Sequence, residues 1–228
     1  MADYLNEGLK KIGFAQEEIA NFQDKLIGYA KELQNGNDQY GLTAIVDYDE
    51  IIIRHILDSL VAVPKLKELK EKIIKNRENF NTEDFVIGDI GSGGGIPGIP
   101  LASVLDHTNF ILAERMTKRC AFLNHCKDSL GLENVTIETI EAERIAQKRF
   151  DMIVFRAFRP LDKKMTRVLL RILKEDGILV AYKAKKEKIL EEMDAIKQWV
   201  PQYEIFPLDV PFLEDYERNL VIVEKALI

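Results

Sequence analysis

A glycine-rich loop between a strand pattern and a helix pattern is the feature that most constrains the fold of this chain. The apolar run Phe85–Ile90 is typical of a buried strand, and it leads directly into Gly91–Pro100, which holds five glycines and two prolines. Glycines let the backbone turn tightly and let a ligand approach it closely. In open α/β sheets, ligands bind at the carboxyl ends of the strands. The loop therefore predicts a ligand site there; the alternative is a turn that only tightens a strand–helix junction.

Strand patterns alternate with helical patterns after this loop. The expected strands are Phe85–Ile90, Phe110–Ala113, Val135–Ile140, Met152–Phe155, Ile178–Tyr182, Tyr203–Val210 and Asn219–Lys225. Alternating strands and helices predict a parallel sheet with right-handed crossovers. The last two strands follow each other after one helix and predict an antiparallel hairpin. The expected fold is α/β, with a mostly parallel seven-stranded sheet.

The first third of the chain reads as helices. Residues Glu17–Leu33 carry an apolar stripe at three- and four-residue spacing, and Asn35-Gly36-Asn37 predicts the end of that helix. A second helix is expected from Asp49 to Val63, ending at Pro64. The charged stretch 65–84 suggests no function. We therefore expect a helical extension over residues 1–83 and an α/β domain over 84–228.

Composition excludes several classes of protein. The chain has 228 residues, of which 46% are hydrophobic and 31% charged, as in ordinary globular proteins. No apolar stretch is long enough for a membrane span, and the first residues do not resemble a signal peptide. Cys120 and Cys126 are the only cysteines and lack metal-ligand spacing. We expect a cytoplasmic protein without a bound metal.

The residues beside the loop distinguish between two cofactor classes. Gly93, Gly95 and Gly98 formally match a dinucleotide fingerprint, and Glu114 lies at the spacing of a ribose-binding acid. However, Asp89 ends the first strand, and its carboxylate would repel a pyrophosphate. It would attract the ammonium and sulfonium of S-adenosylmethionine, which has no phosphate. The interpretation is that Asp89, Gly93 and Glu114 bind S-adenosylmethionine.

Charge is distributed unevenly along the chain. The formal net charge is −6, which disfavours a generally basic nucleic-acid binder. Residues 156–188 nevertheless contain 11 Lys or Arg against 4 Asp or Glu. Such a run is often only a solvated face, so its position in the fold decides its meaning.

Several motifs together resemble the bacterial small-subunit ribosomal RNA guanine-N7 methyltransferases, known as methyltransferase G or glucose-inhibited division protein B. They are Arg54–Leu60, the loop Asp89–Pro100, Lys118-Arg119 with Phe122-Leu123, and Phe150-Asp151 leading into Arg156-Ala157-Phe158. The resemblance implies a class I, Rossmann-like methyltransferase fold behind an N-terminal extension. It also implies S-adenosylmethionine-dependent methylation of a guanine in the decoding-region loop of 16S rRNA, free or in the assembled small subunit.

The resemblance carries site residues onto this chain. By position, the cofactor contacts of the family fall on Gly91, Ile96, Ala142, Glu143 and Arg156. The catalytic residue stays unknown, because a neutral guanine N7 needs no deprotonation before it attacks the methyl group. Arg156 is the candidate, and we expect it to orient the cofactor or to hold a phosphate. His55 is expected to be a packed residue oriented by Asp58.

The basic segment then lies beside the cofactor opening. The residues expected to bind RNA phosphates there are Arg159, Lys163, Lys164, Lys183, Lys185 and Lys186. Arg167 and Arg171 are expected on a solvated helix. Gly41 departs from the resemblance, since the family usually has asparagine there. Two alternatives stay open: an NAD-dependent oxidoreductase, and a catalytically silent RNA-binding assembly factor on the same scaffold.

Overall fold

The structure, a computed structural model describing residues 3–228, contains one seven-stranded sheet in the order β3-β2-β1-β4-β5-β7-β6. The strands are β1 Val86–Ile90, β2 Asn109–Glu114, β3 Val135–Thr139, β4 Phe150–Arg156, β5 Leu173–Lys183, β6 Glu204–Pro207 and β7 Asn219–Glu224. Strands β1 to β5 pair in parallel, and β7 pairs antiparallel with both β5 and β6. The expected mostly parallel sheet with a C-terminal hairpin is therefore confirmed.

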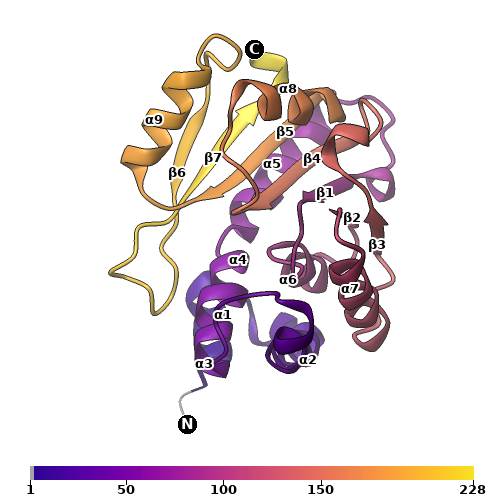
Figure 1. Cartoon of the computed structure of the whole chain (residues 1–228), viewed down its shortest axis with the longest axis vertical. Coiled ribbons are helices and arrows are strands. Elements are labelled where there is room, and N and C mark those ends of the chain that lie inside the picture. Colours follow the sequence, from indigo (N-terminus) through magenta and orange to yellow (C-terminus); the bar gives the residue numbers. More distant parts are fainter. Residues whose placement is uncertain (1–2) are drawn as a thin grey trace.

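Helices cover both faces of this sheet (Figure 1). Helices α6 (Gly98–Val104) and α7 (Thr117–Ser129) share one apolar core with the N-terminal helices, while α8 (Lys163–Ile172) and α9 (Lys186–Ile196) build a second core on the other face. Short 3-10 turns span Thr82–Asp84, Ala142–Arg144 and Lys225–Leu227. No helix within residues 3–228 is long and apolar enough to cross a membrane.

The extension is helical, as expected, but two of its boundaries differ. It comprises α1 Tyr4–Ile12, α2 Gln16–Tyr40, α3 Tyr48–Ile51, a π-helical turn Ile52–Leu57, α4 Asp58–Leu60 and α5 Val63–Lys75. The predicted stop at Gly36 is wrong, because α2 continues to Tyr40. A Cβ atom at Gly36 would lie 3.1 Å from the Phe122 ring, so this glycine permits close packing of α2 on α7.

Pro64 begins a helix where the sequence predicted that one ends. It lies in the first turn of α5, where a backbone N–H would have no partner inside the helix. The apolar side chains of the extension belong to the same core as one face of the sheet. The division of the chain at residue 83 stays a prediction.

Arg77 gives the stretch 65–84 a structural role. Its guanidinium pairs with Asp151, which is fully buried at the start of β4, and with Asp176. Asp151 also accepts hydrogen bonds from Lys174 Nζ at 2.9 Å and from the Val86 backbone at 2.8 Å. The segment after α5 is thus joined to the amino-terminal edge of β1 and β4, opposite the glycine loop.

We expect Arg77→Ala to lower the free energy of unfolding by about 3 kcal/mol, because it removes one partner of a buried ion pair. Lys75→Ala is the matched control, since Lys75 and Glu71 form an exposed pair at 3.9 Å. Its change should stay below roughly 1 kcal/mol. Chemical denaturation measures both variants, and equal losses would contradict a structural role for Arg77.

Candidate functional site

The glycine loop leaves β1 and turns back over the carboxyl ends of the strands. Gly91 and Gly93 have φ angles of +73° and +57°, in the left-handed region that side chains disfavour. A Cβ atom on Gly91 would lie 2.0 Å from the Phe158 ring, whereas one on Gly93 would meet nothing closer than 3.9 Å. The loop therefore presents bare backbone beside Phe158.

Three side chains from three elements hold the backbone of this loop. Asp89 at the end of β1 accepts a hydrogen bond from the Gly98 N–H at 2.9 Å. Glu114 at the end of β2 accepts one from the Gly93 N–H at 3.0 Å, and Tyr29 of α2 donates its hydroxyl to the Gly94 carbonyl at 2.7 Å. Tyr29 is not among the residues predicted to form the site, because its spacing in the apolar stripe of the helix marks it only as a core residue.

Asp89 is wholly buried beneath the loop. Burial raises the pKa of its carboxyl group to about 7, against the lowering effect of the Gly98 hydrogen bond. Its second oxygen, Oδ1, has no hydrogen-bond partner among the residues that the structure describes. A buried acceptor without a donor is costly, so this oxygen is suited to a donor supplied by a ligand.

A small cavity of about 200 Å³ opens next to the loop. Its lining includes four of the residues predicted to bind the cofactor, namely Gly91, Glu114, Ala142 and Glu143. Gly93 adjoins it through its hydrogen bond to Glu114, and Ile96 is half-buried against the apolar core. Glu114 also accepts a hydrogen bond from the Met116 N–H at 2.8 Å, which fixes its carboxylate at the cavity wall.

Glu143 reaches the cavity from the turn that follows β3. Its carboxylate accepts a hydrogen bond from Arg159 at 3.2 Å, and Lys164 lies 3.8 Å away. A hydrogen bond from its own backbone N–H, followed by the charges of Arg159 and Lys164, lowers its pKa. Glu143 is therefore an ionised acceptor, and it binds one of the residues that the sequence assigned to RNA.

A second cavity of about 900 Å³ adjoins the first and shares Ala157, Phe158 and Arg159 with it. It lies between the extension, the ends of β4 and β5, and α9. Six cationic side chains line it, against three acidic ones. The cations are Arg54, Arg156, Arg159, Lys183, Lys188 and Arg218, and the acids are Asp58, Asp162 and Glu192. An acidic protein thus has an electropositive hollow beside its glycine loop.

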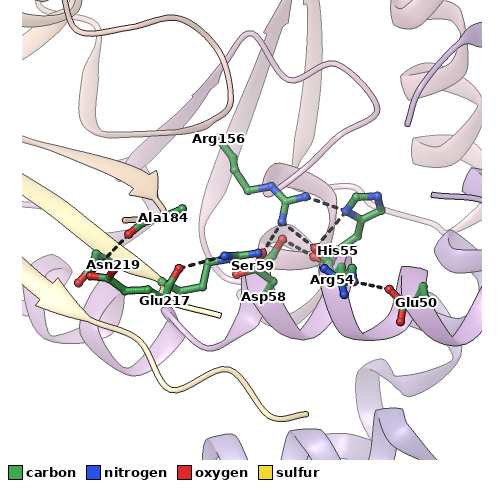
Figure 2. Close-up of polar contacts among 10 residues, drawn as sticks. Glu50, Arg54, His55, Asp58, Ser59, Arg156, Ala184, Glu217 and Asn219 are labelled. Carbon is green, nitrogen blue, oxygen red and sulfur yellow. Dashed lines mark hydrogen bonds and ion pairs between the residues drawn. The ribbon is translucent and has the colours of Figure 1, made fainter. Parts of the chain in front are cut away.

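Arg156 faces the larger cavity, where the π-helical turn of the extension holds it (Figure 2). Its Nη1 donates to Asp58 at 3.0 Å and to the Arg54 carbonyl at 3.0 Å. Its Nη2 lies 2.7 Å from Nδ1 of His55, and Arg218 donates to the same oxygen of Asp58 at 3.2 Å. The structure therefore does not bring Arg156 to the wall of the small cavity.

His55 is a packed residue, as expected, but its partner differs from the prediction. Asp58 binds Arg156 and Arg218 and does not orient the imidazole ring. Because a guanidinium only donates, Nδ1 accepts from Arg156, and Nε2 then donates to the Thr43 hydroxyl at 2.7 Å. Burial, and then the charge of Arg156, lower the pKa of His55 to about 4. The ring is neutral near pH 7 and positions Arg156.

The residues predicted to bind RNA are divided among several surfaces. Arg159 lines both cavities, and Lys183 lines the larger one, where it pairs with Glu192 at 2.7 Å. Lys163 and Lys164 lie together at the start of α8. Lys185 is exposed before α9, and Lys186 lines another hollow beside the β6–β7 loop.

Gly41, which departs from the family pattern, ends α2 in the left-handed conformation with a φ of +62°. Glycine and asparagine are the residues that most readily adopt this conformation at a helix end. The polar contact at this position is made by the backbone, since the Gly41 carbonyl accepts a hydrogen bond from the Arg119 guanidinium at 3.2 Å. The backbone geometry thus explains why glycine can replace asparagine at this position.

Comparisons with known proteins agree on one family. The family model described as rRNA small subunit methyltransferase G matches residues 22–221. Ribosomal RNA small subunit methyltransferase G of Treponema denticola is 41% identical over 97% of this chain and 93% of its own length. The Neisseria meningitidis serogroup B protein of the same name is 33% identical over 97% of each chain.

Solved structures show a similar fold. A Methanococcus maripaludis protein assigned as an S-adenosyl-L-methionine-dependent methyltransferase has a TM-score of 0.56 at 16% identity, covering 87% of this chain and 93% of its own. The human methyltransferase 10 domain containing protein has a TM-score of 0.54 at 11% identity, covering 90% of this chain and 100% of its own. The class I methyltransferase fold that the sequence predicted is confirmed.

We expect His55 to make stability depend on pH. Its pKa is lower in the folded chain than in the unfolded one, so its stabilising contribution is complete above about pH 6.5 and is lost as the pH falls toward about 4. The loss is about 3 kcal/mol at most. His55→Gln should remove this part of the pH dependence of the unfolding free energy. An imidazole that titrates near pH 6.5 by NMR would contradict the assignment.

Proposed function

The chain belongs to the rRNA small subunit methyltransferase G family, and from that membership we propose that it transfers a methyl group from S-adenosylmethionine to N7 of a guanine in the decoding-region loop of 16S rRNA. The observation that carries the proposal is a bare glycine loop between two carboxylates, Asp89 and Glu114, beside an electropositive cavity. The same site implies a cytoplasmic enzyme whose partner is rRNA, free or in the assembled small subunit.

The residues around the loop fit S-adenosylmethionine better than a dinucleotide. Oδ1 of Asp89 is a buried acceptor without a partner, as an ammonium donor requires. Each oxygen of Glu114 accepts only one backbone hydrogen bond, so lone pairs remain for two ribose hydroxyls. Glu143 lines the same cavity as Glu114. Arg115, Arg119 and Arg159 also line this cavity, so the argument against a pyrophosphate rests on the carboxylate of Asp89 buried beneath the loop, which disfavours an oxidoreductase.

The other predicted contacts keep their proposed roles. Ala142 offers its backbone, and Glu143 its carboxylate, to the adenine edge. Gly93 leaves room for the cofactor against the loop, Gly91 lines the small cavity beside the Phe158 ring, and the half-buried Ile96 stays a proposed cofactor contact. The cofactor supplies an electrophilic methyl group on a sulfonium, and the remaining task of this chain is positioning.

The reaction at N7 requires alignment and no proton transfer. Guanine N7 has a lone pair and no proton, so no side chain has to remove one. The neutral His55 and the tightly bound Arg156 are consistent with this, since neither is poised as a base. Arg156 is fixed by three hydrogen-bond partners and gives the larger cavity a rigid wall. Holding N7 in contact with the methyl carbon and in line with the carbon–sulfur bond can account for most of the rate acceleration of this methyl transfer.

The electropositive cavity supports an RNA substrate. RNA phosphates are attracted to clustered Lys and Arg, and an acidic chain needs a local patch to bind them. Arg159, Lys163, Lys164, Lys183, Lys185 and Lys186 stay the proposed phosphate contacts. Glu143 pairs with Arg159, and Glu192 pairs with Lys183. Each carboxylate neutralises part of the positive charge that these two side chains offer to a phosphate at the active site.

We expect Gly93→Ala to weaken S-adenosylmethionine binding at least tenfold, because the added methyl group would occupy the approach to the loop. Gly131→Ala is the matched control. Gly131 has a φ of +60° with nothing within 4 Å of an added Cβ, so both variants carry a similar backbone strain of roughly 1 kcal/mol. Calorimetry should show unchanged affinity for Gly131→Ala. Equal affinities in both variants would place the cofactor away from Gly93.

The proposed function predicts transfer of a labelled methyl group from S-adenosylmethionine to 16S rRNA. Small subunits and free 16S rRNA from a strain lacking the enzyme serve as substrates, and large subunits as the control. Mass mapping should find one modified guanine in 16S rRNA. Cofactor binding without transfer to either substrate would favour the silent assembly factor, and NAD binding with no S-adenosylmethionine binding would favour the oxidoreductase.

A further inference from the structure

One face of α8 carries four cationic side chains. Lys163, Lys164, Arg167 and Arg171 line a hollow of about 620 Å³, together with Asp162 and Val168. The sequence pattern suggested a solvated helix face for the two arginines. Both are exposed on α8, as expected, and they line the same hollow as Lys163 and Lys164, two of the residues already expected to contact RNA.

This arrangement is electrostatically unfavourable within the chain. Lys163 and Lys164 occupy the first turn of the helix, where the helix dipole disfavours positive charge. Lys163 and Arg167, and then Arg167 and Arg171, are like-charge pairs at i,i+4, which destabilise a helix. Only Asp162 offsets them at the helix start, and its side chain caps the Met165 N–H.

Few acids neutralise these cations. Within residues 3–228, Lys163, Arg167 and Arg171 form no ion pair, and Lys164 lies 3.8 Å from Glu143, which already binds Arg159. Arg171 donates only to the Glu143 carbonyl, at 3.1 Å. Four nearly uncompensated charges on one face indicate a polyanionic partner.

Trp199 fixes two of the cations in place. Lys163 Nζ lies 4.9 Å and Arg167 Cζ 5.6 Å from the centroid of its indole ring. The cation–π contacts limit the freedom of both side chains, so less entropy is lost when a ligand binds. Trp199 is thus a positioning residue for this face.

The α8 hollow continues the site already described. It shares Asp162 with the larger cavity, which in turn shares Ala157, Phe158 and Arg159 with the small one. The three hollows therefore adjoin in the order small cavity, larger cavity, α8 face. If the target base of an RNA lies in the larger cavity, the phosphates next to that base would lie over α8.

We propose that Lys163, Lys164, Arg167 and Arg171 bind the phosphate backbone of single-stranded RNA that flanks the target guanine. The proposal rests on the proposed function for the identity of the RNA. Its physical basis is charge complementarity together with continuity with the larger cavity. Phosphate contacts of this kind set the register of the strand and carry no sequence preference.

A uridine dodecamer tests the proposal without occupying the site for guanine. Trp199 is the only tryptophan in the chain, so its fluorescence reports on this face alone. The α8 variant changes Lys163, Lys164, Arg167 and Arg171 to Ala. The control variant removes four exposed charges of the extension by changing Lys10, Lys31, Lys67 and Lys75 to Ala.

We expect the dodecamer to change the Trp199 emission of the wild type. The α8 variant should bind it at least tenfold more weakly, with a salt slope lower by up to about 3, since each single-strand phosphate contact contributes about 0.7. The control variant should bind nearly as the wild type does. Equal weakening in both variants, or an unchanged Trp199 emission, would overturn the proposal.

Methylation of small subunits separates this proposal from the proposed function. If the wild type transfers no methyl group, the proposed function fails while the dodecamer result still stands. If the α8 variant raises KM on small subunits but binds the dodecamer normally, the face contacts a ribosomal protein and the RNA proposal is overturned. A raised KM together with weaker dodecamer binding, at unchanged S-adenosylmethionine affinity, supports it.

Discussion

Three hydrogen bonds fix the glycine loop, and the rest of the site depends on them: Asp89 and Glu114 accept from its N–H groups, and Tyr29 donates to one of its carbonyls. Two of these residues end neighbouring parallel strands, so the order of the sheet places both carboxylates beside the loop. The third belongs to α2, which makes the extension part of the site. Holding the loop this way leaves Asp89 buried with an oxygen that has no partner in the described chain, a cost that bound cofactor would offset.

The sequence pattern predicted those elements whose structure depends on residues close to one another in the chain. The seven strands, the glycine loop and Glu114 follow from apolar runs, backbone freedom and spacing, and the structure places them as expected. What failed depends on neighbours distant in sequence. Gly36 marks close packing against Phe122 and no helix end. Arg156 ends β4 as predicted, and its partners Asp58 and His55, which hold it at the larger cavity, could not be inferred from spacing.

Charge links the fold to the proposed substrate. The net charge is −6, while the walls of the larger cavity and the exposed face of α8 are cationic. The small cavity is balanced by comparison, with Glu114, Glu141 and Glu143 against Arg115, Arg119 and Arg159. The excess of positive charge thus belongs to the larger cavity and the α8 face, and Phe158 and Arg159 lie at the boundary of the two cavities, where methyl transfer would occur.

Positioning alone is sufficient chemistry when the nucleophile is N7 of guanine, so the mechanism depends on the identity of that atom. The direct measurement uses 16S rRNA transcribed with 7-deazaguanosine, which replaces N7 by carbon, and a second transcript with inosine, which keeps N7 but lacks the 2-amino group. We expect methyl transfer to the inosine transcript, with altered affinity, and none to the 7-deazaguanosine transcript. Transfer of a methyl group to the 7-deazaguanosine transcript would contradict it.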